Sequence, residues 1–246
     1  MEGAEPGDSI VVTIVKLETN RAMAYSGSLL APYAATPQAI ATRKDSEPKR
    51  VTWTIDKAKG VATLDQTEVQ PGGITLPLRP MLGCIGVAPS MGEARSTIVP
   101  GPFGGNMDCW EVRPGNTVHL GVNVPGAMLS VGDGHYAMGD GEIMGAAIEG
   151  AMQVELFVEL LRKEATPVPR IENLDEVMFV GSGRPLEDAA RVAFEAMIGW
   201  VRARTNLTEM DAYQFVSQQA RAHIVQIVDP EYTVLVALDK ARLPKS

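Results

Sequence analysis

Two stretches in which apolar and polar residues alternate constrain the fold of this chain more than any other feature. In residues 117–124 and 152–160 the even-numbered positions are apolar, whereas most odd-numbered positions are polar or small. A period of two places alternate side chains on opposite faces of an extended strand, so each stretch predicts a strand with one buried face. On the second strand, Glu155 and Glu159 are expected to face solvent.

The N-terminal part of the chain also has the character of strands. Residues 9–17 are rich in β-branched side chains, residues 50–56 alternate, and residues 60–64 follow a Lys-Gly turn. Together these segments predict an antiparallel meander. Pro125 and Gly126, which follow the strand at 117–124, predict a hairpin turn.

The C-terminal part predicts two helices. Apolar residues recur at helical spacing from Leu186 to Val201, over about four turns. Thr208 and Asp211 resemble a capping box with Asp in place of Glu, and an apolar face that includes Phe215 follows them. Two helices joined by a short turn predict a helical hairpin packed on the sheet.

These elements predict a β-rich α+β fold. We expect antiparallel sheets that form a sandwich or barrel-like core, with the helical hairpin at the C-terminal end. A length of 246 residues and a hydrophobic content of 45% are enough for a single domain with a sizeable core. Within it, the β-rich part is expected at about residues 1–165 and an α/β part at about residues 166–246.

The segment 104–149 concentrates acidic side chains, histidine and glycine. Asp133 is two residues from His135, and Asp140 is two residues from Glu142, so in extended backbone each pair points to one side. Glycines at 132, 134, 139 and 141 remove bulk and permit unusual backbone angles, so this segment can wrap closely around a small ligand. A metal ion fits that description.

Carboxylates combined with one imidazole are typical ligands of divalent cations. A tetrahedral shell favours zinc, a larger shell favours manganese or iron, and a shell dominated by oxygen favours calcium; zinc is our first choice. Turn formation is the alternative, because Asp and Gly are also common turn residues. Glu149 is either a ligand or a partner that orients one. The candidate ligands are Asp108, Asp133, His135, Asp140 and Glu149.

Three other reactive side chains carry weaker signals. Cys109 follows Asp108 directly, so a thiol nucleophile is the rival chemistry, although free cysteines are usually buried as small hydrophobic residues. His119 lies on the polar face of its strand, but nothing pairs with it at ligand spacing. His223 is expected to be a packed or surface residue.

Charge and hydropathy exclude several classes of protein. The formal net charge is -8, and the chain lacks the clustered Lys and Arg that phosphate contacts need, so we expect no nucleic-acid partner. No run of about eighteen apolar residues occurs, and the N-terminus has neither a basic nor an apolar signal region, so we expect no membrane association and a cytoplasmic location.

Five segments carry the motifs of one known family, in matching order. They read EGAEPGDSIVVTI at 2–14, LRPMLGCIGVAP at 78–89, PGPFGGNMDCWEVRPGNTVHLGVNVPGA at 100–127, SVGDGHYAMGDGEIMGAAIE at 130–149 and QIVDP at 226–230. With these motifs, nearly the whole chain resembles the acetamidase/formamidase family. In family members we expect an N-terminal stretch to precede the motif EGAEPGD. This chain starts at that motif, so we expect it to lack the family's N-terminal stretch.

The resemblance implies hydrolysis of the carbon–nitrogen bond of a small linear amide, such as formamide or acetamide, to a carboxylate and ammonia. Our hypothesis is metal-assisted hydrolysis, in which Asp108 and His135, with Asp133 or Asp140, hold the cation. Glu142 is then the general base, and Asn106 donates to the developing oxyanion.

Two other functions stay open at this point: a Cys109-dependent amidase, and a metal-stabilised member that binds a small molecule without catalysis or with a different specificity. Because a sheet-rich chain with a missing segment leaves exposed strand edges, we also expect a homo-oligomer.

Overall fold

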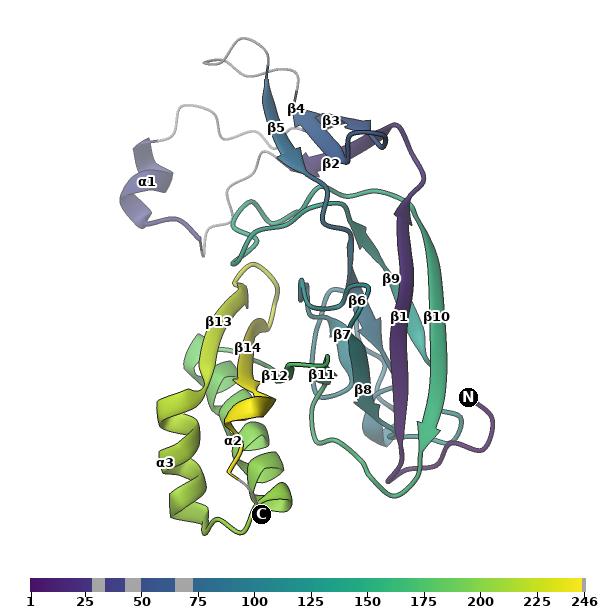
Figure 1. The fold of residues 1–246 in the computed structure, drawn as a ribbon. Helices are drawn as coiled ribbons and strands as arrows, with labels where there is room; N and C mark the ends of the chain where they lie inside the picture. The colour runs from purple at the N-terminus through teal and green to yellow at the C-terminus, as the bar shows by residue number, and fades with distance from the viewer. Residues whose placement is uncertain (28–33, 43–49, 65–72, 245–246) are drawn as a thin grey trace.

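The computed structural model describes residues 1–27, 34–42, 50–64 and 73–244, and in this part of the chain three antiparallel sheets form the framework (Figure 1). The largest has seven strands in the order β10-β1-β8-β11-β12-β14-β13. Their bounds are β1 Ser9–Thr19, β8 Thr117–Gly121, β10 Met152–Leu161, β11 Arg170–Glu172, β12 Glu176–Gly183, β13 Arg221–Gln226 and β14 Tyr232–Asp239.

Two helices cover the C-terminal half of this sheet. Helix α2 (Leu186–Arg204) packs on β12 and β14 through its apolar stripe, and α3 (Glu209–Gln219) packs beside it. The Thr208 hydroxyl accepts a hydrogen bond from the backbone N–H of Asp211 at 3.2 Å, which confirms the predicted cap. The helical hairpin is therefore present where the sequence predicts it.

A three-stranded sheet packs against the other half of the large sheet. Its order is β7-β6-β9, with β6 at Met81–Gly86, β7 at Gly104–Asn106 and β9 at Ser130–His135. Ile10 and Leu120 of the large sheet share one buried cluster with Leu82 and Ile85 of β6. The β-rich α+β prediction is confirmed, and the sheets of the described residues form open layers rather than a closed barrel.

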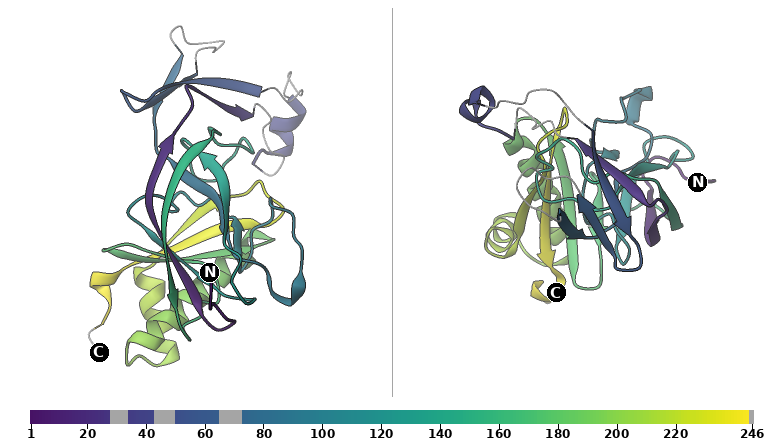
Figure 2. Two further views of the ribbon diagram at one scale, coloured as in Figure 1. Left: turned by 90° about the vertical axis from the view of Figure 1, so that its right-hand side faces the viewer. Right: turned by 90° about the horizontal axis from the view of Figure 1, so that it is seen from above.

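The third sheet lies at the end of the molecule opposite to the two long helices, as Figures 1 and 2 both show. It contains β2 (Met23–Gly27), β3 (Arg50–Asp56), β4 (Val61–Leu64) and β5 (Ile74–Pro77) in sequence order. The short helices of the described residues are α1 at Pro37–Thr42, η1 at Ser90–Gly92 and η2 at Lys240–Arg242. No described helix is long and apolar enough to cross a membrane.

The predicted meander is correct for residues 50–56 and 60–64 but wrong for residues 9–17. Strand β1 lies in the large sheet, between β8 and β10, and only the chain after it enters the small sheet. The reason is that β1 alternates buried Ile10, Val12 and Ile14 over the main core, which the small sheet does not reach.

The hairpin predicted at Pro125 and Gly126 is also wrong. Strand β8 already has two neighbours, β1 and β11, so neither of its edges is free to pair with the strand that follows. The chain instead turns at Gly126, whose φ of 82° suits glycine, and crosses to β9 in the three-stranded sheet. This crossing carries Asp133 and His135 away from the large sheet.

On the large sheet, His119 belongs to a polar cluster of its own. Arg170 Nη2 lies 2.9 Å from His119 Nδ1, and Arg170 Nε lies 2.7 Å from Glu172 Oε1. Glu172 Oε2 in turn lies 2.8 Å from Lys240 Nζ. Burial and the charge of Arg170 lower the pKa of His119 to about 4, so this histidine is neutral in the folded protein at pH 7.

The depressed pKa of His119 predicts a loss of stability in mild acid. The unfolded chain, with a histidine pKa of about 6.5, binds the proton first, so the contribution is complete above that pH and falls towards pH 4. Between pH 7 and pH 5, we expect wild type to lose about 1–2 kcal/mol more unfolding free energy than His119→Gln, measured by urea denaturation. Parallel losses in the two proteins would contradict this assignment.

Candidate metal centre

The imidazole of His135 lies at the centre of a ring of carboxylates. Its Nε2 is 3.2 Å from Asp133 Oδ2, 3.3 Å from Glu149 Oε1 and 3.7 Å from Asp108 Oδ1. One potential ligand atom from each of Asp108, Asp133 and His135 lies within 4.8 Å of the others, and the same is true of His135, Glu142 and Glu149. Side chains at this separation can share one small cation.

Three elements bring these side chains together. Asp133 and His135 project from the same side of β9, as their spacing of two predicts. Asp108 follows β7, and Glu142 and Glu149 lie on the segment after β9. The backbone of Glu149 pairs with Tyr25 of β2 and forms a bridge to His135, so it ties the small sheet to the site.

Asp108 is buried and only partly hydrogen-bonded. Asn106 Nδ2 donates to Asp108 Oδ2 at 3.0 Å and to Asp229 Oδ2 at 2.9 Å. Oδ1 of Asp108 is buried, and no group in the described part of the chain forms a hydrogen bond with it. A buried carboxylate oxygen without a partner is costly, and a bound cation is one group that would satisfy it.

Backbone conformation supports the convergence of the acids. Asp108, Asp133 and Glu142 all have positive φ angles, of 49°, 59° and 46°. Such angles are uncommon for residues other than glycine, and strain of this kind gathers at functional sites. Gly83 of β6 supplies the space, because a Cβ built there would lie 2.3 Å from Asp133 Oδ2 and 2.5 Å from Asp108 Oδ1.

Burial and mutual repulsion oppose ionisation of several acids in this group. Burial raises the pKa of Asp108 well above its usual value, and the charges of Glu142 and Asp229 raise it further. Burial likewise raises the pKa values of Glu142 and Glu149 to about 7, although the charge of His135 lowers both. A single imidazole therefore does not neutralise the acids that surround it.

His135 and Asp133 shift in opposite directions. Burial lowers the pKa of His135, but the hydrogen bond with Asp133 and the charge of Glu149 outweigh it, and the net shift is upward. For Asp133, burial raises the pKa, but the hydrogen bond and charge of His135 prevail and lower it. The two side chains thus stabilise each other in their charged forms when no cation is bound.

A cavity of about 460 Å³ opens beside the ring of carboxylates. Several of the acids contribute to its wall, so a small polar molecule in it would lie next to the candidate ligands. The residues that line it are Cys84, Thr97, Ile98, Asn106, Ser130, Val131, Gly132, Asp133, Glu142, Gly145, Glu149 and Asp229.

Comparison with known proteins identifies the family to which the chain belongs. The model of the acetamidase/formamidase family matches residues 91–241, which is more than half of the chain and includes all of these acids. This chain belongs to the acetamidase/formamidase family. Its motifs at 100–127, 130–149 and 226–230 fall within the matched region.

Solved structures of acetamidases share the fold over nearly the whole chain. The acetamidase from Yersinia enterocolitica is 32% identical with a TM-score of 0.86, over 99% of this chain and 72% of that one. The acetamidase from Bacillus halodurans is also 32% identical, with a TM-score of 0.85. The match covers 97% of this chain and 75% of that one.

A curated relative matches over a shorter stretch. A putative formamidase of Schizosaccharomyces pombe is 45% identical over 60 residues, which are 24% of this chain and 15% of that protein. The matched stretch thus spans less than a fifth of the relative's length.

The structure does not bring Asp140 into the site of this family member. Its carboxylate is 54% exposed, and Oδ2 lies 3.6 Å from His223 Nδ1 at the surface. The spacing of two between Asp140 and Glu142 places both on one side only in extended backbone. Glu142 instead has a φ of 46° and lies between two turns that its backbone N–H and C=O close with Gly139 and Gly145. Glu142 therefore points to the centre and Asp140 away from it.

The other reactive side chains also lie apart from the centre or are inert. His119 belongs to the polar cluster on the large sheet. His223 is half-buried, with its ring edge-on to Trp110, in agreement with the prediction of a packed or surface residue. Cys109 is fully buried, and burial raises its pKa to about 12, which is unfavourable for a thiolate nucleophile.

Sequence reasoning missed Asp229. The residue follows β13, far along the chain, yet it shares the Asn106 amide with Asp108 and lines the cavity. Gln226 Oε1 accepts hydrogen bonds from the backbone N–H groups of Val228 and Asp229, both at 3.0 Å, and so shapes the turn that presents it. The sequence did contain a signal for Asp229, because this residue belongs to QIVDP, one of the five family motifs.

The space at Gly83 leads to a prediction about the candidate metal centre. Gly83→Ala places a methyl group against the carboxylates of Asp108 and Asp133, so we expect at least a tenfold weaker affinity for Zn²⁺ with the fold retained. Isothermal titration with Zn²⁺ and circular dichroism measure the two properties.

The matched control is Gly199→Ala on helix α2, where an added Cβ meets no atom of the described residues within 4 Å. Unchanged Zn²⁺ affinity in Gly83→Ala, or an equal loss in Gly199→Ala, would contradict the role of Gly83.

Proposed function

We propose that this protein hydrolyses the carbon–nitrogen bond of small linear amides to a carboxylate and ammonia, with a divalent cation held at His135. Membership of the acetamidase/formamidase family supports the reaction. The observation that supports the cation is Oδ1 of Asp108, which is buried and has no hydrogen-bond partner among the described residues. Potential ligand atoms of Asp108, Asp133 and His135, one from each, lie within 4.8 Å of one another.

The donor set fits a cation such as zinc. In our proposal Asp108, Asp133 and His135 are the ligands, and Glu149 is a fourth ligand or orients His135. A divalent charge would offset the repulsion that raises the pKa of Asp108. When bound, the cation supplies Lewis-acid activation of the amide carbonyl and of water.

Glu142 is our candidate for the general base. Its carboxylate lines the cavity beside the candidate ligands, where it can reach a water molecule or an amide nitrogen. Burial raises its pKa to about 7 in the protein without a cation. In the proposed reaction Glu142 accepts a proton from water and passes it to the leaving nitrogen. The nitrogen then departs as ammonia instead of an amide anion.

For Asn106 the hydrogen bonds favour a different role from the one expected. Its Nδ2 group donates to Asp108 and to Asp229, so both of its N–H groups are engaged and neither is free for an oxyanion. We therefore propose that Asn106 positions Asp108 and Asp229 through these two hydrogen bonds and does not itself contact the reacting carbonyl group.

Metal-dependent release of ammonia tests the proposed function. Acetamide and formamide are incubated with purified protein before chelation, after chelation and after Zn²⁺ is restored. We expect ammonia release to fall at least a hundredfold on chelation and to recover with the metal. Bound metal without ammonia from either amide would favour the non-catalytic binding protein or a member with a different specificity.

Two variants separate the chemical roles in the same assay. Glu142→Gln should reduce kcat at least a hundredfold and leave zinc content unchanged, because it removes a proton acceptor but no proposed ligand. Equal loss of zinc would make Glu142 a ligand. Cys109→Ala should keep its activity, and a hundredfold loss there with the fold intact would favour the thiol mechanism instead.

We also propose that the protein is a homo-oligomer. Strand β10 is at the edge of the large sheet, and its Phe157 side chain is exposed. An unpaired edge with apolar side chains favours association with a second chain. Light scattering at micromolar concentration that reports a monomer would contradict this proposal.

A further inference from the structure

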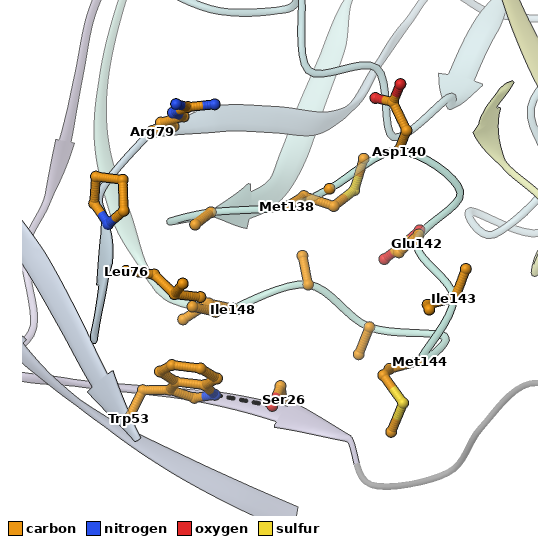
Figure 3. A pocket seen from close by; sticks show the side chains of 15 residues that line it. Ser26, Trp53, Leu76, Arg79, Met138, Asp140, Glu142, Ile143, Met144 and Ile148 are labelled. Atoms are coloured by element: carbon orange, nitrogen blue, oxygen red, sulfur yellow. Dashed lines mark hydrogen bonds between the residues drawn. The ribbon is translucent and has the colours of Figure 1, made fainter. Parts of the chain in front are cut away.

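A second cavity, which we name the apolar pocket, adjoins the candidate metal centre. Its volume is about 540 Å³, within the range of small-molecule sites. Figure 3 shows its large side chains around one space, with Arg79 and Asp140 at its edge. The apolar residues labelled there are Trp53, Leu76, Met138, Ile143, Met144 and Ile148.

The lining combines buried residues, such as Trp53 and Ile148, with large apolar residues that are more exposed than a protein core. Leu76 is 39% exposed and Ile143 is 51% exposed, although both are large apolar residues beside the cavity. Exposed apolar side chains gathered around one hollow are typical of ligand sites. The indole N–H of Trp53 donates to Ser26 Oγ at 2.9 Å, which fixes the ring in the wall of the pocket, where most of its surface is already packed against neighbouring side chains.

Glu142 links this pocket to the metal centre. It lines both the apolar pocket and the acidic cavity, and its carboxylate is close to His135 and Glu149. Ala147 lines the apolar pocket too, and its backbone N–H donates to Glu149 Oε1 at 2.9 Å. One segment of chain therefore forms part of the wall of the apolar pocket and also presents two acids to the candidate metal centre.

The dimensions indicate what the pocket would hold. Formamide and acetamide are small enough for the acidic cavity alone, so they leave about 540 Å³ of apolar space unused. Hydrocarbon surface is the chemistry that Trp53, Leu76 and Ile148 would recognise, because its burial releases water without requiring new hydrogen bonds.

We propose that the apolar pocket binds the hydrocarbon part of the acyl group, so that the preferred substrates are primary amides with acyl chains of several carbons. This inference rests on the proposed amidase function for its chemistry. The acyl chain extends past Glu142 into the pocket, while the carbonyl group and the nitrogen stay beside His135.

A chain-length series tests the proposal. kcat/KM is measured for acetamide, butanamide and hexanamide on the zinc-loaded protein. We expect an increase of about threefold to fourfold for each added methylene group. Binding of the same amides to protein without metal, measured by calorimetry, should rise in the same order. A kcat/KM that stays flat or falls with chain length would overturn the proposal.

Matched leucine variants locate the effect. Leu76→Ser removes apolar surface from the pocket, and Leu174→Ser makes the same change at a side chain that is 96% exposed outside it. We expect the ratio of hexanamide to acetamide kcat/KM to fall at least fivefold in Leu76→Ser and to stay at the wild-type value in Leu174→Ser. Equal ratios in the two variants would overturn the assignment.

Failure of the pocket and failure of the amidase function give different results. Metal-dependent hydrolysis of acetamide without any gain for hexanamide contradicts the pocket alone. Chain-length-dependent binding that is weakened by Leu76→Ser, without ammonia from any amide, supports the pocket and contradicts the amidase function.

Discussion

The arrangement around His135 depends on one electrostatic constraint, the crowding of carboxylates about a single buried imidazole. Burial and mutual repulsion raise the pKa values of Asp108, Glu142 and Glu149, and one histidine supplies too little positive charge to offset them. Such crowding is unfavourable in the folded protein without a cation. It becomes favourable when a divalent cation is bound between the carboxylate oxygens. The unpartnered Oδ1 of Asp108 is the clearest local sign of that need.

The fold brings the residues of this centre together from segments that are far apart in the sequence. The three-stranded sheet supplies Asp133 and His135, and the bare backbone of Gly83 gives the acids room. The small sheet holds Glu149 through its backbone pairing with Tyr25, and the turn after β13 adds Asp229. The core between the two larger sheets provides the rigid support on which such a site relies.

Local patterns in the sequence predict local geometry well. Period-two alternation predicts β8 and β10, helical spacing predicts α2, and the spacing of Asp133 and His135 predicts that they share a side. Such local patterns do not predict which distant strands pair. Strand β1 pairs with β8 and β10, in which the paired residues lie more than a hundred positions further along the chain than their partners in β1. The predictions for two acids fail for a related reason. The backbone between Asp140 and Glu142 is not extended, so Asp140 points away from the centre, and tertiary packing brings Asp229 to the centre from a distant part of the sequence.

Anomalous diffraction at the zinc absorption edge, on crystals of the protein loaded with Zn²⁺, tests directly whether the crowded acids form a metal site. The predicted result is one strong peak bounded by Asp108 Oδ1, an Asp133 carboxylate oxygen and His135 Nε2, at about 2.0–2.2 Å from each. A peak elsewhere, or none beside His135 at saturating zinc, would contradict the metal centre and leave His135 as the counter-ion of Asp133.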